Sequence, residues 1–218
     1  MTTQVFAVAK PLPRQEETTY TLLDSKGDRV GTARFTITPE GEALRAGIAY
    51  DFGPTQQDTS SIVLQPDTMK PASSERTVVE GDKRSVTRAE YTGDKVATIF
   101  DDGKRNQRRE AKISDTAYDN LASLFLWRTF DMTPGREVRY ANIVVDPRNG
   151  TISRALATLT VAGREEVRLP SGTSVQAWRV RFTSAGTTNT AWYRDDDSRV
   201  LVKYEITRGP TLFLDAGP

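Results

Sequence analysis

Residues 115–130 read DTAYDNLASLFLWRTF, and this stretch decides the fold that we predict for the chain. One apolar face recurs at helical spacing and consists of Ala117, Tyr118, Leu121, Leu124 and Phe125. Leu126, Trp127 and Phe130 lie off that face, so the predicted helix is apolar nearly all round. Elsewhere the sequence reads as strands and tight turns. The stretch is therefore the one convincing helix of a mainly β protein.

The predicted helix has recognisable start and stop signals. Ser114 or Asp115 can accept hydrogen bonds from the free amides of the first turn, and Asp119 adds negative charge near the positive end of the helix dipole. Pro134 and Gly135 follow as terminators. We therefore predict a helix over about 115–130.

The breadth of the apolar surface indicates what surrounds this helix. A helix that rests on a flat sheet needs one apolar stripe only. A helix that is apolar on two sides favours a curved sheet that closes around it, or a ligand or partner that covers its second side.

Turn signals about 10 to 12 residues apart favour an antiparallel sheet over βαβ units. Glycines such as Gly27 and Gly41 separate short alternating segments, and residues 51–60 are expected to form the first longer loop. The predicted strands cover residues 18–24, 29–38, 43–51, 61–64, 76–80, 84–92, 96–100, 137–146, 151–162, 165–169, 173–183, 190–194, 200–207 and 211–214.

Length and composition favour one domain. The chain has 218 residues, and we expect residues 1–17 to be an extended N-terminal segment and 18–218 a single β domain. The net charge of +1 gives no reason to expect a nucleic acid partner. No segment is long enough for a transmembrane helix, and the short apolar run Val5 to Ala9 is no signal peptide. The protein is then cytoplasmic, or a leader has been removed.

Most catalytic and metal chemistries lack their residues in this sequence. The chain contains no His and no Cys, which excludes Ser-His and Cys-His nucleophiles, His-based metal sites and disulfides. The Ser-x-x-Lys pattern, the P-loop and the dinucleotide fingerprint are also missing. We expect no cofactor, no metal and no enzymatic activity.

Three charged segments have both a structural and a functional interpretation. Asp101-Asp102-Gly103 is typical of a hairpin turn, and Asp195-Asp196-Asp197 of a solvated turn, although either could supply carboxylates. The basic residues between Lys104 and Lys112 favour an exposed or edge strand protected from aggregation over a phosphate site. Trp178 and Trp192 are interpreted as sheet-core residues, with cavity lining as the alternative.

Several motifs together resemble a known bacterial family. The first consists of Asp115, Leu121 and the run Leu124 to Arg128, and a Pro-Gly turn at Pro134 follows it. The others are GREEVRLPSGT at 163–173, AWYRDD at 191–196 and VLVKYE at 200–205. This order is similar to that of the family called domain of unknown function 3108, over roughly Tyr20 to Leu214.

The resemblance implies a fold and a location but no catalytic residues. Members of the family are usually exported, and their expected form is similar to the periplasmic lipoprotein carriers. The expectation is a mainly β fold, a large, strongly curved antiparallel sheet (an unclosed barrel) wrapped around one central α-helix. A periplasmic or other extracytoplasmic location follows from it, with a cytoplasmic one as the alternative.

The leading hypothesis is a non-enzymatic cell-envelope protein that binds a lipid, an acyl chain or a lipidated partner between sheet and helix. The expected binding residues are Leu124, Leu126, Trp127, Phe130, Trp178 and Trp192. The alternative is a structural or protein-interaction module in which the same helix completes a packed core. A third hypothesis, a carboxylate-dependent hydrolase, rests on Asp101, Asp102 and the Asp195 cluster alone.

Overall fold

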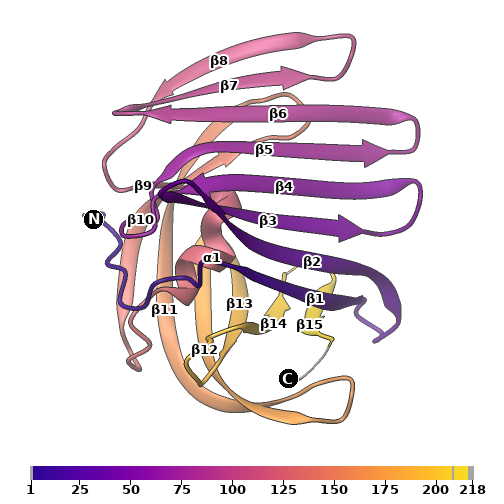
Figure 1. Ribbon diagram of the computed structural model, residues 1–218, viewed down its shortest axis with the longest axis vertical. Helices are drawn as coiled ribbons and strands as arrows, with labels where there is room; N and C mark the ends of the chain where they lie inside the picture. The colour runs from indigo at the N-terminus through magenta and orange to yellow at the C-terminus, as the bar shows by residue number, and fades with distance from the viewer. Residues whose placement is uncertain (1, 208, 216–218) are drawn as a thin grey trace.

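The computed structural model describes residues 2–207 and 209–215, and these form one sheet of fifteen strands with a short helical segment inside it (Figure 1). Within these residues no helix is long and apolar enough to cross a membrane. The strands are β1 (Glu16–Leu23), β2 (Arg29–Glu40), β3 (Ala43–Asp51), β4 (Gln56–Leu64), β5 (Pro71–Glu80), β6 (Lys83–Thr92), β7 (Lys95–Asp101), β8 (Asn106–Lys112), β9 (Ala117–Asp119), β10 (Glu137–Val145), β11 (Ile152–Arg168), β12 (Ser174–Ser184), β13 (Thr187–Arg194), β14 (Leu201–Glu205) and β15 (Thr211–Leu214).

The sheet is built from two meanders joined at the chain ends. Strands β1 to β8 pair in sequence order, as do β9 to β15, and β1 pairs with β15. All neighbours are antiparallel except β9 and β10. β8 and β9 form the two edges, so the barrel does not close. The predicted fold class, a large unclosed sheet around one central helix, is confirmed.

The helical segment lies between the two meanders, as Figure 1 shows. Phe125 packs on Phe35 of β2, with ring centroids 5.8 Å apart, and Trp127 packs on Phe182 of β12 at 4.5 Å. The helix therefore fills the interior that the bent sheet encloses. Each large apolar side chain buried in this way contributes roughly 1.5 to 3 kcal/mol.

The predicted helix over 115–130 is too long at both ends. A 3-10 turn, η1 (Asn120–Ala122), leads into α1 (Ser123–Arg128), while residues 117–119 form β9. The N-cap is Asp119, whose carboxylate accepts from the amide of Leu121 at 2.9 Å, rather than Ser114 or Asp115. The helix ends at Arg128, with Thr129 as its C-cap, well before Pro134.

Contacts with distant parts of the chain explain why residues 117–119 form a strand instead of the first helical turn. Ala117 and Asp119 pair in parallel with Ala141 and Ile143 of β10. Lys70 adds a hydrogen bond to the carbonyl oxygen of Ala117 at 3.1 Å, and its ammonium lies 4.0 Å from the Tyr118 ring centroid. Helix propensity is weak compared with such contacts.

Residues 2–15, which precede β1, contain no helix or strand, but they are packed against the helical segment. Phe6 is only 2% exposed, and its ring lies 5.0 Å from that of Phe130. Its amide donates to the hydroxyl of Tyr118 at 2.9 Å, and the amide of Ala9 donates to the carbonyl oxygen of Thr129. The chain's own N-terminus therefore covers one side of the helical segment.

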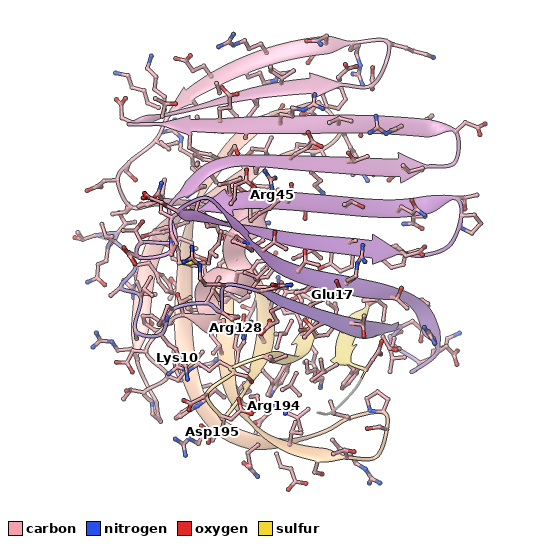
Figure 2. All side chains as sticks on the ribbon, in the orientation of Figure 1. Lys10, Glu17, Arg45, Arg128, Arg194 and Asp195 are labelled. Atoms are coloured by element: carbon pink, nitrogen blue, oxygen red, sulfur yellow. The ribbon has the colours of Figure 1, made fainter. Side chains whose placement is uncertain are left out.

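Polar contacts fix the helix at its C-terminal end. The Arg128 guanidinium, which is central in Figure 2, makes a paired contact with the Glu16 carboxylate at 2.5 and 2.7 Å and also donates to the carbonyl oxygen of Ser198. Arg199 donates to the carbonyl oxygen of Phe130 at 2.7 Å. Positive charge near the C-terminal end of a helix is favoured by the helix dipole, so both arginines stabilise this end.

Two strand predictions also need correction. Residues 56–60 belong to β4 instead of a loop, because they pair with β5 along their whole length. The two strands predicted at 151–162 and 165–169 are one strand, β11, whose register shifts between Val161 and Gly163. The sheet absorbs the glycine as a bulge without ending the strand.

We predict that Phe6→Ala lowers the free energy of unfolding by about 3 to 5 kcal/mol, because the substitution leaves a cavity against Phe130 and Tyr140. Urea unfolding followed by tryptophan fluorescence measures the change. The matched control is Val5→Ala, because Val5 is 52% exposed and should change stability by less than about 0.5 kcal/mol. Equal, small effects of both substitutions would show that the N-terminal segment does not hold the helix.

Candidate ligand-binding groove

A groove with a volume of about 330 Å³ lies between the helical segment and the concave face of the sheet. The helical segment, the β1–β8 meander and the β9–β15 meander all contribute to its wall. The apolar residues that border it are Ile48, Tyr50, Phe52, Leu121, Leu124, Trp127, Phe182, Tyr204, Ile206 and Pro210. The wall is thus mainly apolar and aromatic, as in most small-molecule sites.

A few polar groups interrupt this apolar wall. Arg76 of β5 donates to both oxygens of Asp58 on β4, at 2.9 and 2.5 Å, and the two side chains are 29% and 22% exposed. Asn189 of β13 donates to the hydroxyl of Tyr204 at 3.0 Å. Ser60, Asn120 and Ser123 complete the polar border. The pair Arg76–Asp58 is the only ion pair among the groove residues that the structure describes.

Two of the six predicted binding residues border the groove, Leu124 and Trp127. Trp127 is 1% exposed, and its indole nitrogen donates to the hydroxyl of Tyr140 at 2.9 Å. The hydroxyl of Tyr193 also holds the helix, by donating to the carbonyl oxygen of Leu124 at 2.7 Å. Trp127 therefore belongs to the core and to the groove wall at once.

The other four predicted residues lie elsewhere. Leu126 is fully buried away from the groove, and Phe130 packs under Phe6. The Arg164 guanidinium covers the ring of Trp178 at 4.1 Å, beside the 195–197 turn. Trp192 lies among charged side chains, with its nitrogen 2.6 Å from Glu165 and the Lys203 ammonium over its ring. We remove these four from the candidate binding residues.

None of the sheet residues that border the groove was predicted from the sequence. Ile48 and Tyr50 occupy alternate positions of β3, and Asp58 and Ser60 alternate positions of β4. Alternation along each strand is visible in the sequence and identifies which residues share a face. It does not reveal which strands curve around the helix, because that depends on pairing over long distances.

A buried carboxylate lies next to the groove, where the helix begins. Asp119 is 2% exposed and accepts hydrogen bonds from the hydroxyls of Ser74 and Tyr91, both at 2.7 Å, and from the amide of Leu121. Burial raises the pKa of Asp119 above its ordinary value, although these three donors oppose the shift. The positive charge of Arg76 also lowers the pKa of Asp119, but Asp58 already pairs with this guanidinium.

The two acidic motifs form turns, which agrees with the structural interpretation of their sequences. Asp101 and Asp102 accept from the amides of Gly103, Lys104 and Arg105 in the β7–β8 turn. Asp196 accepts from the amides of Ser198 and Arg199, and Asp195 and Asp197 are paired with Arg164 and Lys10. Figure 2 shows Asp195 and Arg194 together at the lower end of the molecule.

No cluster of three or more His, Cys, Asp or Glu side chains suited to a metal ion is present in residues 2–207 and 209–215. The basic segment after Lys104 includes β8, which is an edge strand with mostly exposed side chains, as predicted.

A family model described as "Protein of unknown function (DUF3108)" matches residues 17–214, which span the sheet from β1 to β15 and include the whole groove. The chain belongs to this family. No curated protein and no solved structure matches the chain significantly. The DUF3108 family assignment thus agrees with the resemblance of the sequence motifs. The description of the family names no activity.

We predict that Asp119→Asn increases stability at neutral pH. The raised pKa means that the folded protein holds this proton to higher pH than the unfolded chain does. Stability therefore falls as the pH rises from the ordinary pKa of 3.8 through the raised value, where the buried carboxyl ionises. Asparagine stays neutral and can still accept from Leu121, so the variant lacks this fall.

Urea unfolding at a series of pH values from acid to neutral tests this prediction. The two proteins should have equal stability at the acid end and diverge with rising pH, with the variant more stable. Asp67→Asn, at an exposed turn position, is the control and should follow the wild type throughout. A variant that becomes less stable than the wild type as the pH rises would show that the charged carboxylate stabilises the fold.

Proposed function

We propose that this protein binds a hydrophobic ligand, a lipid, an acyl chain or the chain of a lipidated partner, in the groove between helix and sheet. The observation that carries the proposal is the hollow of about 330 Å³ beside Leu124 and Trp127. Its volume lies at the lower end of the range of roughly 300 to 1,000 Å³ typical of ligand sites. The proposed role is binding without catalysis.

The distribution of cover around the helix supports this proposal. The N-terminal segment covers the Phe130 side, and the sheet covers the Phe125 and Leu126 sides. Leu121 and Leu124 still face the groove, and Leu121 is only partly buried. A helix that is apolar beyond what its own chain covers favours an apolar occupant at that side.

The packed-core module remains the second candidate, and the fixed position of Trp127 favours it. A packed Trp→Ala substitution costs about 3 to 5 kcal/mol. Because Trp127 is both hydrogen-bonded to Tyr140 and part of the groove wall, that loss would occur under either function. A substitution that fills the groove without removing core atoms separates the two candidates better.

The resemblance to periplasmic carriers extends the proposal to the cell envelope. An acyl chain that leaves a membrane must be shielded from water, since each exposed methylene costs roughly 0.8 kcal/mol. An apolar groove lined by residues from the helix and both meanders could provide such shielding. The location in the envelope rests on the family resemblance of the motifs, and the shielding on the groove.

We predict that Ser60→Phe weakens binding of a fluorescent fatty acid at least about tenfold. Ser60 lies on the concave face of β4 at the groove, so a phenyl ring there occupies the ligand's space. Ser61→Phe is the matched control, because Ser61 lies on the opposite face beside Arg45. Titration of wild type and both variants, with circular dichroism to verify folding, measures the effect.

Mass spectrometry of organic extracts from the purified protein provides an independent readout. The wild type and Ser61→Phe should retain an apolar molecule that Ser60→Phe lacks. If the wild type shows a clean extract and no saturable binding, or if both variants bind as the wild type does, the groove is not a binding site and the packed-core module is the better description.

A further inference from the structure

A second and larger hollow, of about 760 Å³, lies at the turn ends of β5 to β8. Val78 and the buried Phe100 provide its apolar surface. Five basic and three acidic side chains surround it, and they are Lys83, Arg84, Lys104, Arg105, Arg148, Glu80, Asp82 and Asp102. The hollow therefore has a net charge of +2 in a chain whose net charge is only +1.

The basic residues converge from three separate turns. Lys83 and Arg84 follow the β5–β6 turn, Lys104 and Arg105 lie in the β7–β8 turn, and Arg148 lies in the β10–β11 turn. Arg105 is paired with Asp102. Within the described part of the chain, the other four basic side chains make no ion pair. Among the described residues, four cations without an ion-pair partner and two carboxylates without one, Glu80 and Asp82, thus border one hollow, which leaves an excess of two positive charges.

The turn that carries Arg148 is held firmly against the sheet. Ser85 donates to the carbonyl oxygen of Pro147 at 3.1 Å, and Thr98 donates to that of Gly150 at 3.0 Å. Gly150 has a φ of +67°, and a Cβ there would lie 2.8 Å from the Cβ of Phe100. Only glycine allows this close approach. The backbone at Arg148 is therefore fixed beside the hollow, which reduces the cost of binding.

The basic hollow and the apolar groove are neighbours on one concave surface. Asp58 borders the groove, Val78 borders the hollow, and the two residues are directly opposed in the β4–β5 ladder. Adjacent strands are about 4.8 Å apart. Arg76, two residues before Val78 on β5, also borders the groove, and its pairing with Asp58 neutralises the charge at this boundary.

We propose that the two hollows hold one ligand, an amphiphile whose apolar tail lies in the groove and whose anionic, phosphate-type headgroup lies at the basic hollow. This inference rests on the proposed function and adds the chemical class of the ligand. Charge complementarity supports it, because Arg and Lys side chains without partners match the oxygens of a phosphate group. Val78 and Phe100 accommodate the apolar atoms next to the headgroup.

Two amphiphiles with the same tail test the inference. Dodecyl phosphate and dodecyl maltoside, both below their micellar concentrations, are titrated against the purified protein in competition with the fluorescent fatty acid. The wild type should bind the phosphate about tenfold more tightly than the maltoside, and this preference should shrink with rising salt concentration. Glycerol phosphate, which has the headgroup but no tail, should not compete at the same concentrations.

A variant without three of the basic side chains tests whether the preference for the phosphate headgroup arises at the hollow. Lys83→Gln combined with Lys104→Gln and Arg148→Gln should reduce the affinity for dodecyl phosphate about tenfold and leave that for dodecyl maltoside unchanged. Exposed ion pairs are individually weak, so the loss of three of them together is expected to reduce the affinity by about tenfold only.

The matched control removes three exposed positive charges elsewhere, by Lys26→Gln, Lys112→Gln and Arg154→Gln. It changes the net charge of the protein equally and should leave the preference intact. Equal loss in both triple variants would assign the effect to net charge and overturn the inference.

The outcomes distinguish the inference from the function on which it rests. Equal binding of both amphiphiles would leave the groove as a binding site and overturn the anionic headgroup. Effective competition by glycerol phosphate would make the hollow a site for free phosphates, which also overturns the inference. Binding of neither amphiphile would overturn the proposed function together with the inference.

Discussion

The structure depends on filling the concave face of a sheet that does not close. Fifteen strands satisfy one another's backbone groups from β8 to β9, but their pairing leaves the apolar interior of the bend uncovered. Residues 120–128 supply that cover. A helical segment this short is unstable alone, so it exists because the sheet surrounds it. Trp127 and Tyr140 show the mutual dependence, since each buries a ring and satisfies the other's polar atom.

The same constraint explains which parts of the fold can be predicted from the sequence. Alternation and glycine turns predicted most strands, since these signals are local. The helix was predicted from its apolar residues, and its central part, Leu121 to Arg128, is where those residues are densest. Its predicted first turn failed because residues 117–119 pair with residues 141–143, far along the chain. The packing of Phe6 on Phe130 joins residues still further apart, and no local pattern encodes it.

The candidate site was predicted only in part, for a related reason. An apolar excess on the helical segment is visible in the sequence, and Leu124 and Trp127 border the groove, whereas Leu126 and Phe130, chosen on the same signal, do not. The choice of Trp192 failed because residue type does not indicate which face of a strand a tryptophan occupies. Trp178 shares its face of β12 with Phe182, but it lies four residues away along the strand, beside the 195–197 turn. Arg164 and Lys203 lie over the two tryptophan rings, whereas Phe182 and Tyr204 line the groove. The curvature of the sheet decides between them.

Polarity changes along the concave face, and packing alone does not account for the change. Beside Trp127 the wall is apolar; at Arg76 and Asp58 it carries a half-buried ion pair; beyond Val78 it becomes basic. An ion pair that is 29% and 22% exposed adds little to stability, and apolar residues of similar size would fill the space as well. Arg76 and Asp58 are better understood as the boundary between two environments on one surface. A ligand with one apolar and one charged end is the kind of molecule that such a boundary suits.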